Sequence, residues 1–170
     1  SYNILFYSIS SHFVHAEIRP STHQSIRAAC ASALYKYRDH VFPIWDGCNS
    51  RNVPIHTPDP WASYVAEVKT PGTYTGEMEI MACTMYYHVR FVVIQPGLPS
   101  LLFQPSHPIR SSIRAFWLHF TPGHWQALLM KDHSSASPGY TDRAEHIRLI
   151  PDRNIYTFPS VVPGSAPSPA

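Results

Sequence analysis

The chain has 170 residues, the length of one domain with a sizeable core, and 44% of them are hydrophobic, which excludes a disordered protein. The formal net charge is +2, too small for the basic surface on which nucleic-acid binding depends, so no nucleic-acid partner is expected. No apolar run reaches the length of a membrane span and no signal peptide is recognisable, so no membrane partner is expected either.

The N-terminal part of the chain predicts two helices. An apolar stretch over residues 3–12 indicates a short buried helix. A second helix begins at Pro20, with Ser21 as its N-cap, and its apolar residues recur at helical spacing. The stripe consists of Ile26, Ala29, Cys30, Ala33, Leu34 and Tyr37. On such a stripe we expect Cys30 to be a packed core residue.

A third helix follows a loop at residues 42–58 that is rich in Pro, Asn and Gly. Asp59 is its predicted N-cap and Pro60 lies in its first turn, where a proline is well tolerated. Its inner face is predicted to consist of Trp61, Tyr64, Val65 and Val68.

A fourth helix is predicted over residues 75–88. Glu77 and Glu79 fall in its first turn, where the helix dipole favours acidic side chains. The inner stripe of this helix is predicted to consist of Met78, Met81, Ala82 and Met85.

Beyond this point the pattern indicates strands. Residues 89–94 and 100–103 are apolar and rich in β-branched or aromatic side chains. Residues 113–120 and 125–130 flank a Thr-Pro-Gly turn and predict a β-hairpin, and residues 146–151 indicate a final strand. We therefore expect an α+β fold in which helices pack on a small mixed sheet that ends in a β-hairpin. The domain is expected to span residues 1–150, followed by a Pro/Ser-rich tail at residues 151–170.

Three segments carry a recognisable pattern when they are taken in order. They read SYNILF at residues 1–6, WASYVAEVKTPGTYTGEMEIMA at residues 61–82 and IRAFWLHFTPGHWQALL at residues 113–129. They resemble the signatures of the ovarian-tumour (OTU) family of cysteine deubiquitinases. In that family these are an Asp-Gly-Asn-Cys-Leu-Phe nucleophile helix, a Gly-Thr-Trp-Gly-Gly turn between two helices, and a strand and turn followed by His and an aromatic residue. The resemblance implies a papain-like fold.

The resemblance also assigns roles to single residues. In the family, a cysteine at a helix N-terminus is activated by the helix dipole and a neighbouring histidine, and attacks an isopeptide carbonyl. Ile4 stands at the position of that nucleophile, and Ser1 replaces the acidic residue of the preceding loop. His124 matches the general base, and Gln126 occupies the position of the residue that orients it, although its amide offers no charge to stabilise an imidazolium. Because an isoleucine cannot be ionised, the family's covalent mechanism is impossible at this position.

The same resemblance implies a binding groove and a partner. The family's groove takes the extended C-terminal tail of ubiquitin, and its counterparts here are Asn3, Trp125, Tyr74 and Gly76. We therefore expect a catalytically inactive pseudo-deubiquitinase that binds ubiquitin or a ubiquitin-like protein, or that scaffolds a larger protein assembly. Binding can outlive catalysis because affinity depends largely on the surface around the reactive group.

Three alternatives remain open. An active isopeptidase could use a relocated cysteine, and Cys48, in the long loop, is the candidate. The domain could instead be a purely structural module of a larger polypeptide, or bind nucleic acid, which the low net charge disfavours. His124 itself has a structural interpretation as a residue that leaves the hairpin turn and packs on Trp125.

Neither a metal nor a cofactor is predicted. His12 and His15 have helical spacing, and His119 and His124 flank the hairpin turn, but no third ligand converges on either pair. The three cysteines lack CxxC spacing, which disfavours a zinc ribbon, and their odd number disfavours a disulfide framework. Cysteine usage of this kind favours a reducing, intracellular and most simply cytoplasmic location.

Overall fold

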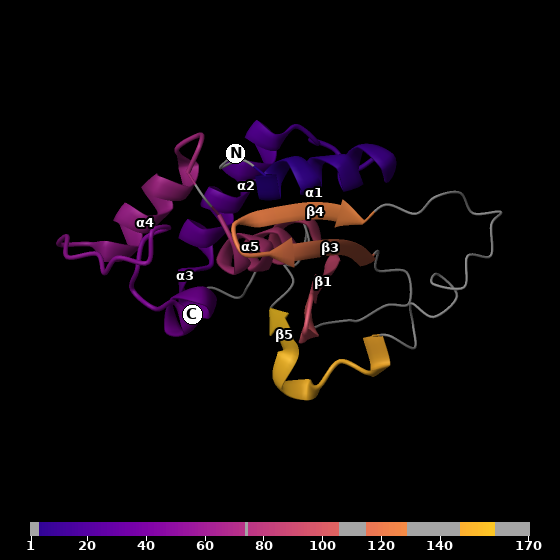
Figure 1. The fold of residues 1–170 in the computed structure, drawn as a ribbon. Helices are drawn as coiled ribbons and strands as arrows, with labels where there is room; N and C mark the ends of the chain where they lie inside the picture. The colour runs from indigo at the N-terminus through magenta and orange to yellow at the C-terminus, as the bar shows by residue number, and fades with distance from the viewer. Residues whose placement is uncertain (1–3, 74, 106–114, 129–146, 159–170) are drawn as a thin grey trace, which may run out of the picture.

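A computed structural model describes residues 4–73, 75–105, 115–128 and 147–158. In this part of the chain the helices come first and the strands follow (Figure 1). The helices are α1 (Ile4–His15), α2 (His23–Lys36), α3 (Arg38–Val41), α4 (Pro60–Lys69) and α5 (Glu77–Tyr87). The strands are β1 (Arg90–Gln95), β2 (Leu98–Pro105), β3 (Ala115–Thr121), β4 (His124–Leu128) and β5 (Ile155–Phe158). Short 3₁₀ turns, η1 (Phe42–Ile44) and η2 (Asp152–Asn154), follow α3 and precede β5.

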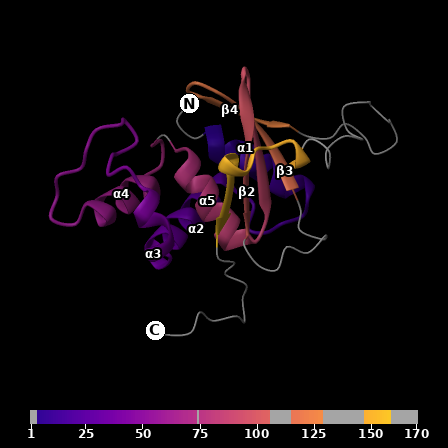
Figure 2. The same cartoon turned by 90° about the horizontal axis from the view of Figure 1, so that it is seen from below.

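The described strands form one mixed sheet in the order β4-β3-β1-β2-β5. Strand β1 pairs antiparallel with β2 and parallel with β3, and β3 pairs antiparallel with β4. The predicted α+β fold with helices on a small mixed sheet is confirmed. Figure 2 shows α3 and α4 to one side of the sheet, with α2 and α5 between them and the strands.

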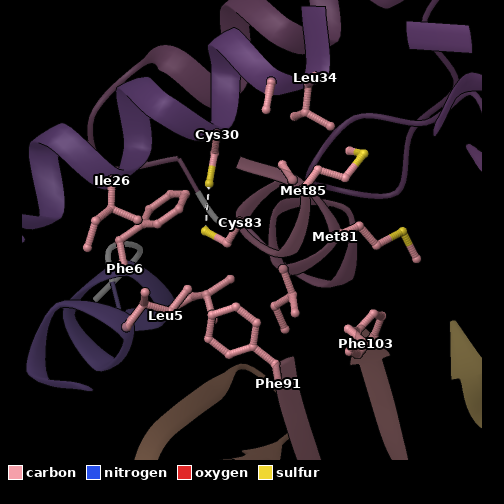
Figure 3. Close-up of a cluster of buried hydrophobic side chains, with 14 of the residues drawn as sticks. Leu5, Phe6, Ile26, Cys30, Leu34, Met81, Cys83, Met85, Phe91 and Phe103 are labelled. Atoms are coloured by element: carbon pink, nitrogen blue, oxygen red, sulfur yellow. Dashed lines mark hydrogen bonds between the residues drawn. The ribbon is translucent and has the colours of Figure 1, made fainter. Parts of the chain in front are cut away.

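Both faces of the central strands are buried, which explains why β1 reads as a continuous apolar run. Phe91 and Val93 face the main core beneath the helices, whereas Val92 points to the opposite face. There it joins a smaller cluster with Leu102, Trp117 and Ile150. The main core is centred on α5, which lies between α2 and the sheet (Figure 3).

The helical predictions hold, with adjusted ends. All six residues of the predicted stripe on α2 are buried, including Cys30. The N-cap of α2 is Thr22 and not Ser21, because the Thr22 hydroxyl accepts a hydrogen bond from the backbone N–H of Ser25 at 3.2 Å. Helix α1 continues to His15, three residues beyond its predicted end.

Helix α4 begins as the sequence predicts. The carboxylate of Asp59 accepts a hydrogen bond from the N–H of Ala62 at 3.2 Å, and Pro60 is the first helical residue. Trp61 and Val68 are buried, and the Trp61 indole donates to the carbonyl of Leu34 on α2 at 3.1 Å. This hydrogen bond fixes α4 against α2.

The hairpin of β3 and β4 is also confirmed. Thr121 pairs with His124, and the two residues between them form the turn, in which Gly123 has a positive φ of 75° that suits a residue without a Cβ. Trp125 lies opposite Phe120, with ring centroids 4.6 Å apart. Phe120, Trp125 and Leu118 face the main core on this side of the hairpin.

Two expectations for the C-terminal part are wrong. Ile147 and Arg148, within the strand predicted at residues 146–151, lie in a helical turn, because Ile147 and Ile150 cover the second apolar face of the sheet. The last strand is β5, inside the range 151–170 that composition assigned to a tail. It pairs parallel with β2, and Phe158 is buried in the main core. The hairpin forms one edge of the sheet and β5 forms the other, and the folded unit includes residues 151–158.

Among the described helices, none combines the length and the apolar character that a bilayer-spanning segment requires.

The position of β5 generates a prediction about truncation. A chain that ends at residue 150 loses the parallel partner of β2 and the buried Phe158 side chain. We expect it to be several kcal/mol less stable than a chain that ends at residue 158, since removing one buried Phe side chain alone costs about 3–5 kcal/mol. Urea denaturation of the two truncated chains measures the difference. Equal stability would show that residues 151–158 behave as a tail.

Candidate functional site

Helix α1 lies along strand β4 at one edge of the sheet (Figure 1). A groove of about 490 Å³ runs between them. We call this the α1–β4 groove. Its lining consists of Ile4, Tyr7, Ser8 and Ser11 from one face of α1, and Trp125, Gln126 and Ala127 from β4. The α1 residues fall at i, i+3, i+4 and i+7, so a single helix face meets the strand.

Ile4 is the first residue of α1 and is half-buried in this groove. Backbone N–H groups at a helix N-terminus carry partial positive charge and stabilise an anion placed beside them. The backbone therefore provides the environment that a thiolate nucleophile requires, but the side chain there is aliphatic. The carbonyl of Ile4 accepts a hydrogen bond from the Ser8 hydroxyl at 3.0 Å, so this serine is engaged within its own helix.

His124 and Gln126 project from the same face of β4, since residues two apart in a strand share a face. Both side chains are exposed, and Trp125 between them points into the core with 3% of its surface exposed. Gln126 lines the α1–β4 groove, whereas His124 stands just outside that lining. In the described part of the structure no hydrogen bond joins the side chains of His124 and Gln126. The structure thus brings Ile4, Trp125 and Gln126 together and leaves His124 at the rim.

The remaining groove candidates divide into two groups. Asn3 and Tyr74 lie outside the described residues. Gly76 caps the start of α5, where its carbonyl accepts the N–H groups of Glu79 and Ile80 at 3.1 and 3.2 Å. Gly76 does not line the α1–β4 groove but a second hollow, which lies on the other side of Trp125.

This second hollow, which we call the loop cleft, has a volume of about 470 Å³. The residue 42–58 loop forms one wall, the start of α5 forms the floor, and residues from the four strands β1, β3, β4 and β5 close the third side. Its lining consists of Ile44, Trp45, Asp46, Cys48, Asn49, Ser50, Asn52, Tyr64, Gly76, Glu77, Met78, Glu79, Met81, Val93, Gln95, Phe120, Trp125 and Tyr156. Five aromatic rings and three carboxylates are among these residues, a combination that suits ligands with an extended apolar body and cationic or N–H groups.

A buried acid lies at the floor of the loop cleft. Glu79 is only 3% exposed, and the hydroxyl of Tyr64 lies 3.1 and 3.0 Å from its two carboxylate oxygens. Burial raises the pKa of Glu79 to about 7, because the charged form is poorly solvated, although the Tyr64 hydrogen bond and the Arg27 guanidinium favour that charged form. Burial and the neighbouring Glu79 carboxylate likewise raise the pKa of Tyr64. The pair therefore places a titratable carboxyl group in the cleft at near-neutral pH.

The neighbouring cation is fixed by backbone groups. The guanidinium of Arg27 donates to the carbonyls of Val68 at 2.8 Å, Thr70 at 3.1 Å and Thr73 at 3.0 Å. These bonds tie α2 to the end of α4 and to the turn that leads into α5. Arg27 is thus held close enough to act on Glu79 electrostatically while it also braces the turn.

Trp125 is the wall that the two hollows share, since it lines both. Its indole N–H is buried and has no hydrogen-bond partner among the described residues. A buried donor without a partner costs free energy, and ligand-binding sites are places where such groups are retained.

Cys48 lines the loop cleft and is partly exposed. Desolvation raises the pKa of its thiol, and the nearby Asp46 carboxylate raises it further. Cys48 therefore lacks the cationic surroundings that activate a thiolate. It also lies in the loop cleft, whereas Ile4 lies in the α1–β4 groove.

The predicted histidine pairs do not extend to larger clusters. Among the described residues, no group of three or more His, Cys, Asp or Glu side chains is arranged to hold a metal ion. His12 is buried, and its Nε2 lies 2.7 Å from the carbonyl of Trp117, so this ring connects α1 to β3.

The Tyr64–Glu79 pair is the part of the site that sequence reasoning missed. The sequence predicts that the helix dipole favours the charged Glu79 side chain in the first turn. In the structure, burial has the largest effect on the pKa of Glu79 and raises it. A signal was present, because α5 is apolar on all sides beyond its first turn, as residues Ile80, Met81 and Ala82 show. A helix of this kind is enclosed, and any acid within it is enclosed too.

Comparison with known proteins follows this geometry. A profile of the family described as OTU-like cysteine protease matches residues 3–119. Among solved structures, the chain is similar to the OTU domain of OTUD1, with 18% sequence identity and a TM-score of 0.55 over 75% of this chain and 79% of that one. It is also similar to the viral OTU domain protease from Taggert virus, with 14% identity and a TM-score of 0.56 over 79% and 76% of the two chains. No curated protein gives a match.

The structural likeness at these identities shows the fold, which is that of an OTU domain. The profile covers Ile4 and ends at residue 119, before the strand that carries His124 and Gln126. The roles of those two residues therefore rest on the local His-aromatic pattern and on the hairpin that presents it.

The buried acid predicts a pH-dependent stability. The folded-state pKa of Glu79, about 7, lies above the ordinary value of 4.5, so the folded protein binds the proton more tightly than the unfolded chain. The contribution of the Glu79 proton to the free energy of unfolding is fully present below pH 4.5 and is lost as the pH rises through 7. The loss amounts to about 3 kcal/mol. We expect Glu79→Gln to remove this part of the decline, so that the variant is more stable than the parent chain at pH 8 in urea titrations.

Tyr64→Phe provides the matched control. The Tyr64 hydroxyl favours the charged form of Glu79, so its removal should move the pH range of the decline upward. A parent chain and a Glu79→Gln variant with parallel pH profiles between pH 5 and pH 8 would contradict the assignment.

Proposed function

The chain belongs to the family of OTU-like cysteine proteases, and from this premise we propose that it is a member without the family's nucleophile, which binds ubiquitin or a ubiquitin-like protein and does not cleave it. The observation that carries the proposal is the place of Ile4. This residue opens α1 and faces β4 across the groove, at the nucleophile position of the resemblance. An aliphatic side chain there can neither be deprotonated nor form an acyl intermediate.

The groups around Ile4 support the hypothesis that the chain keeps the family's site and has lost its reaction. The helix N-terminus is still directed at the groove, and the hairpin still presents a histidine beside an aromatic residue. Gln126 lies on the same face of β4 as His124, which is the placement that an orienting residue needs. A Gln amide leaves an imidazolium without a compensating charge, a further change that catalysis would not favour.

Binding is supported by the surface on the other side of Trp125. The loop cleft has aromatic walls, an acidic floor and an unpaired indole donor, which together suit an extended peptide segment. In the family, the ubiquitin C-terminal tail is such a segment. The cleft and the groove share Trp125, which supports a binding surface that lies directly beside Ile4.

An apolar rim beside the cleft supports a protein partner. Phe42, Ile44 and Val53 belong to the residue 42–58 loop and are 41%, 51% and 52% exposed. Large apolar side chains that gather at the edge of a cleft are typical of protein-binding surfaces. The scaffolding alternative uses the same rim, and differs in that its partner is not ubiquitin-like.

The proposal predicts that catalysis returns with one substitution. We expect the parent chain to leave a fluorogenic ubiquitin substrate intact, and Ile4→Cys to cleave it, because a thiol at this helix N-terminus gains the dipole and His124 as base. Ile4→Cys combined with His124→Ala is the control, and it should lose most of the gained activity. Cleavage by the parent chain would contradict the proposal.

A parallel titration tests binding. Labelled mono-ubiquitin should bind the parent chain, and Met78→Arg should weaken the binding by about tenfold or more, because it places a long charged side chain in the loop cleft. Leu149→Arg is the matched control, since Leu149 is 80% exposed and lines neither hollow. If neither the parent chain nor Ile4→Cys binds or cleaves, the domain is a structural module and the ubiquitin partner is wrong.

The relocated-cysteine alternative has its own test. A ubiquitin probe with a C-terminal electrophile is expected to leave the parent chain unmodified, because the raised pKa of Cys48 keeps its thiol protonated. Mass spectrometry of the mixture measures the adduct, and Cys48→Ser shows whether any adduct depends on this residue. An adduct that disappears in Cys48→Ser would make the protein an active isopeptidase with a displaced nucleophile.

A further inference from the structure

Two cysteines meet in the centre of the main core. Cys30 comes from α2 and Cys83 from α5, and their sulfur atoms are 3.0 Å apart (Figure 3). Both side chains are fully buried, and 53 residues separate them in the sequence. Neither cysteine lines the groove or the cleft.

Weak hydrogen bonds join the two thiols to each other and to the backbone of α5. The Cys30 thiol donates to the carbonyl of Glu79 at 3.5 Å. A second hydrogen bond joins the two sulfur atoms, and either thiol can be its donor. This arrangement holds the sulfur atoms in contact along one line, and only about 1 Å of movement separates it from the length of a disulfide bond.

We propose that Cys30 and Cys83 are a redox-active pair, reduced in the resting protein, whose oxidation forms a disulfide that fastens α2 to α5. Packing already brings the two sulfur atoms to within about 1 Å of bonding distance. The third cysteine, Cys48, lies apart from the pair, in the lining of the loop cleft, and takes no part in the disulfide.

The oxidation balances with a hydroperoxide such as hydrogen peroxide as the oxidant. One thiol, as its thiolate, attacks a peroxide oxygen and breaks the O–O bond, which gives a sulfenic acid and one water molecule. The second thiol attacks the sulfenic sulfur, the S–O bond breaks, and a second water molecule leaves. Two electrons pass from the two sulfur atoms to the peroxide, and the two thiol protons end in the water.

Burial sets which oxidants can act. Both side chains are closed to solvent, and burial together with Cys83 and Glu79 raises the pKa of Cys30 well above its ordinary value. A small uncharged oxidant that enters the core during brief openings therefore reacts in preference to a bulky disulfide. Reaction at the pair is slower than reaction at the partly exposed Cys48.

The disulfide would act on the floor of the loop cleft. Glu79 and Cys83 are one turn apart on α5, and the Cys30 thiol is a donor to the Glu79 carbonyl. Oxidation removes that donor and restrains the α5 turn that carries the buried acid. The redox state of the pair is thereby coupled to the cleft through a single helix turn.

Mass spectrometry of the oxidised protein tests the proposal. The chain is treated with hydrogen peroxide, its free thiols are then alkylated under denaturing conditions, and the protease fragments are analysed. We expect a cross-linked fragment that contains Cys30 and Cys83 and disappears on reduction, in both the parent chain and Cys48→Ser. A pair that yields only sulfinic or sulfonic acids, or cross-links that require Cys48, would overturn the proposal.

Thermal denaturation gives a second readout. The oxidised parent chain should unfold about 5 °C or more above the reduced chain, because the bond closes a long loop in the unfolded state. Cys83→Ala should show no such shift between oxidised and reduced samples, and Cys48→Ser should show the full shift. An oxidised parent chain that carries the cross-link but unfolds at a lower temperature would show that the bond does not fit the native packing, and would overturn the inference.

Discussion

The enclosure of α5 between α2 and the sheet is the constraint on which the rest of the structure depends. Every residue from 79 to 85 is buried, so this helix has no solvent face. The other helices and the strands are arranged so that they cover it, and their own apolar faces are satisfied in the process. The groups that matter for chemistry, Glu79 and Cys83, lie inside the protein because they belong to this helix.

The same helix explains why the two hollows differ. The loop cleft lies where the enclosure of α5 opens at its N-terminus, and its floor is therefore a helix end that carries an acid. The α1–β4 groove lies at an edge of the sheet, where a helix passes a strand and the lining is uncharged. Trp125 divides them, so a partner that reaches both would contact an acidic, aromatic half and a neutral half. Ile4 belongs to the neutral half, and the carboxylates of Glu77 and Glu79 belong to the other.

Much of the fold was predictable because its signals are local. The stripe on α2, the Asp59 cap of α4 and the hairpin turn are each specified by residues only a few positions apart, and the structure confirms them. The short strand β5 was missed although its Ile-Tyr-Thr-Phe sequence favours a strand. It has only four residues, its flanking prolines read as a tail, and its place depends on pairing with β2, about fifty residues earlier. The Tyr64–Glu79 pair was missed for the same reason, since two helices must pack before the hydroxyl reaches the carboxylate. Ile4 could be placed from the motif, whereas the exposure of His124 depends on how the hairpin lies against α1.

The parallel pairing of β2 with β5 has a consequence for the order in which the protein is made. A ribosome delivers β1 and β2 early, and β2 then has an open edge until the last strand of the described chain has emerged. During that interval the row of backbone groups on β2 is available to any other extended segment nearby. The closing strand is four residues long and follows a 3₁₀ turn, so it docks onto a sheet that is otherwise complete. The pairing of β5 therefore covers a strand edge that stays open until residues 155–158 have been made.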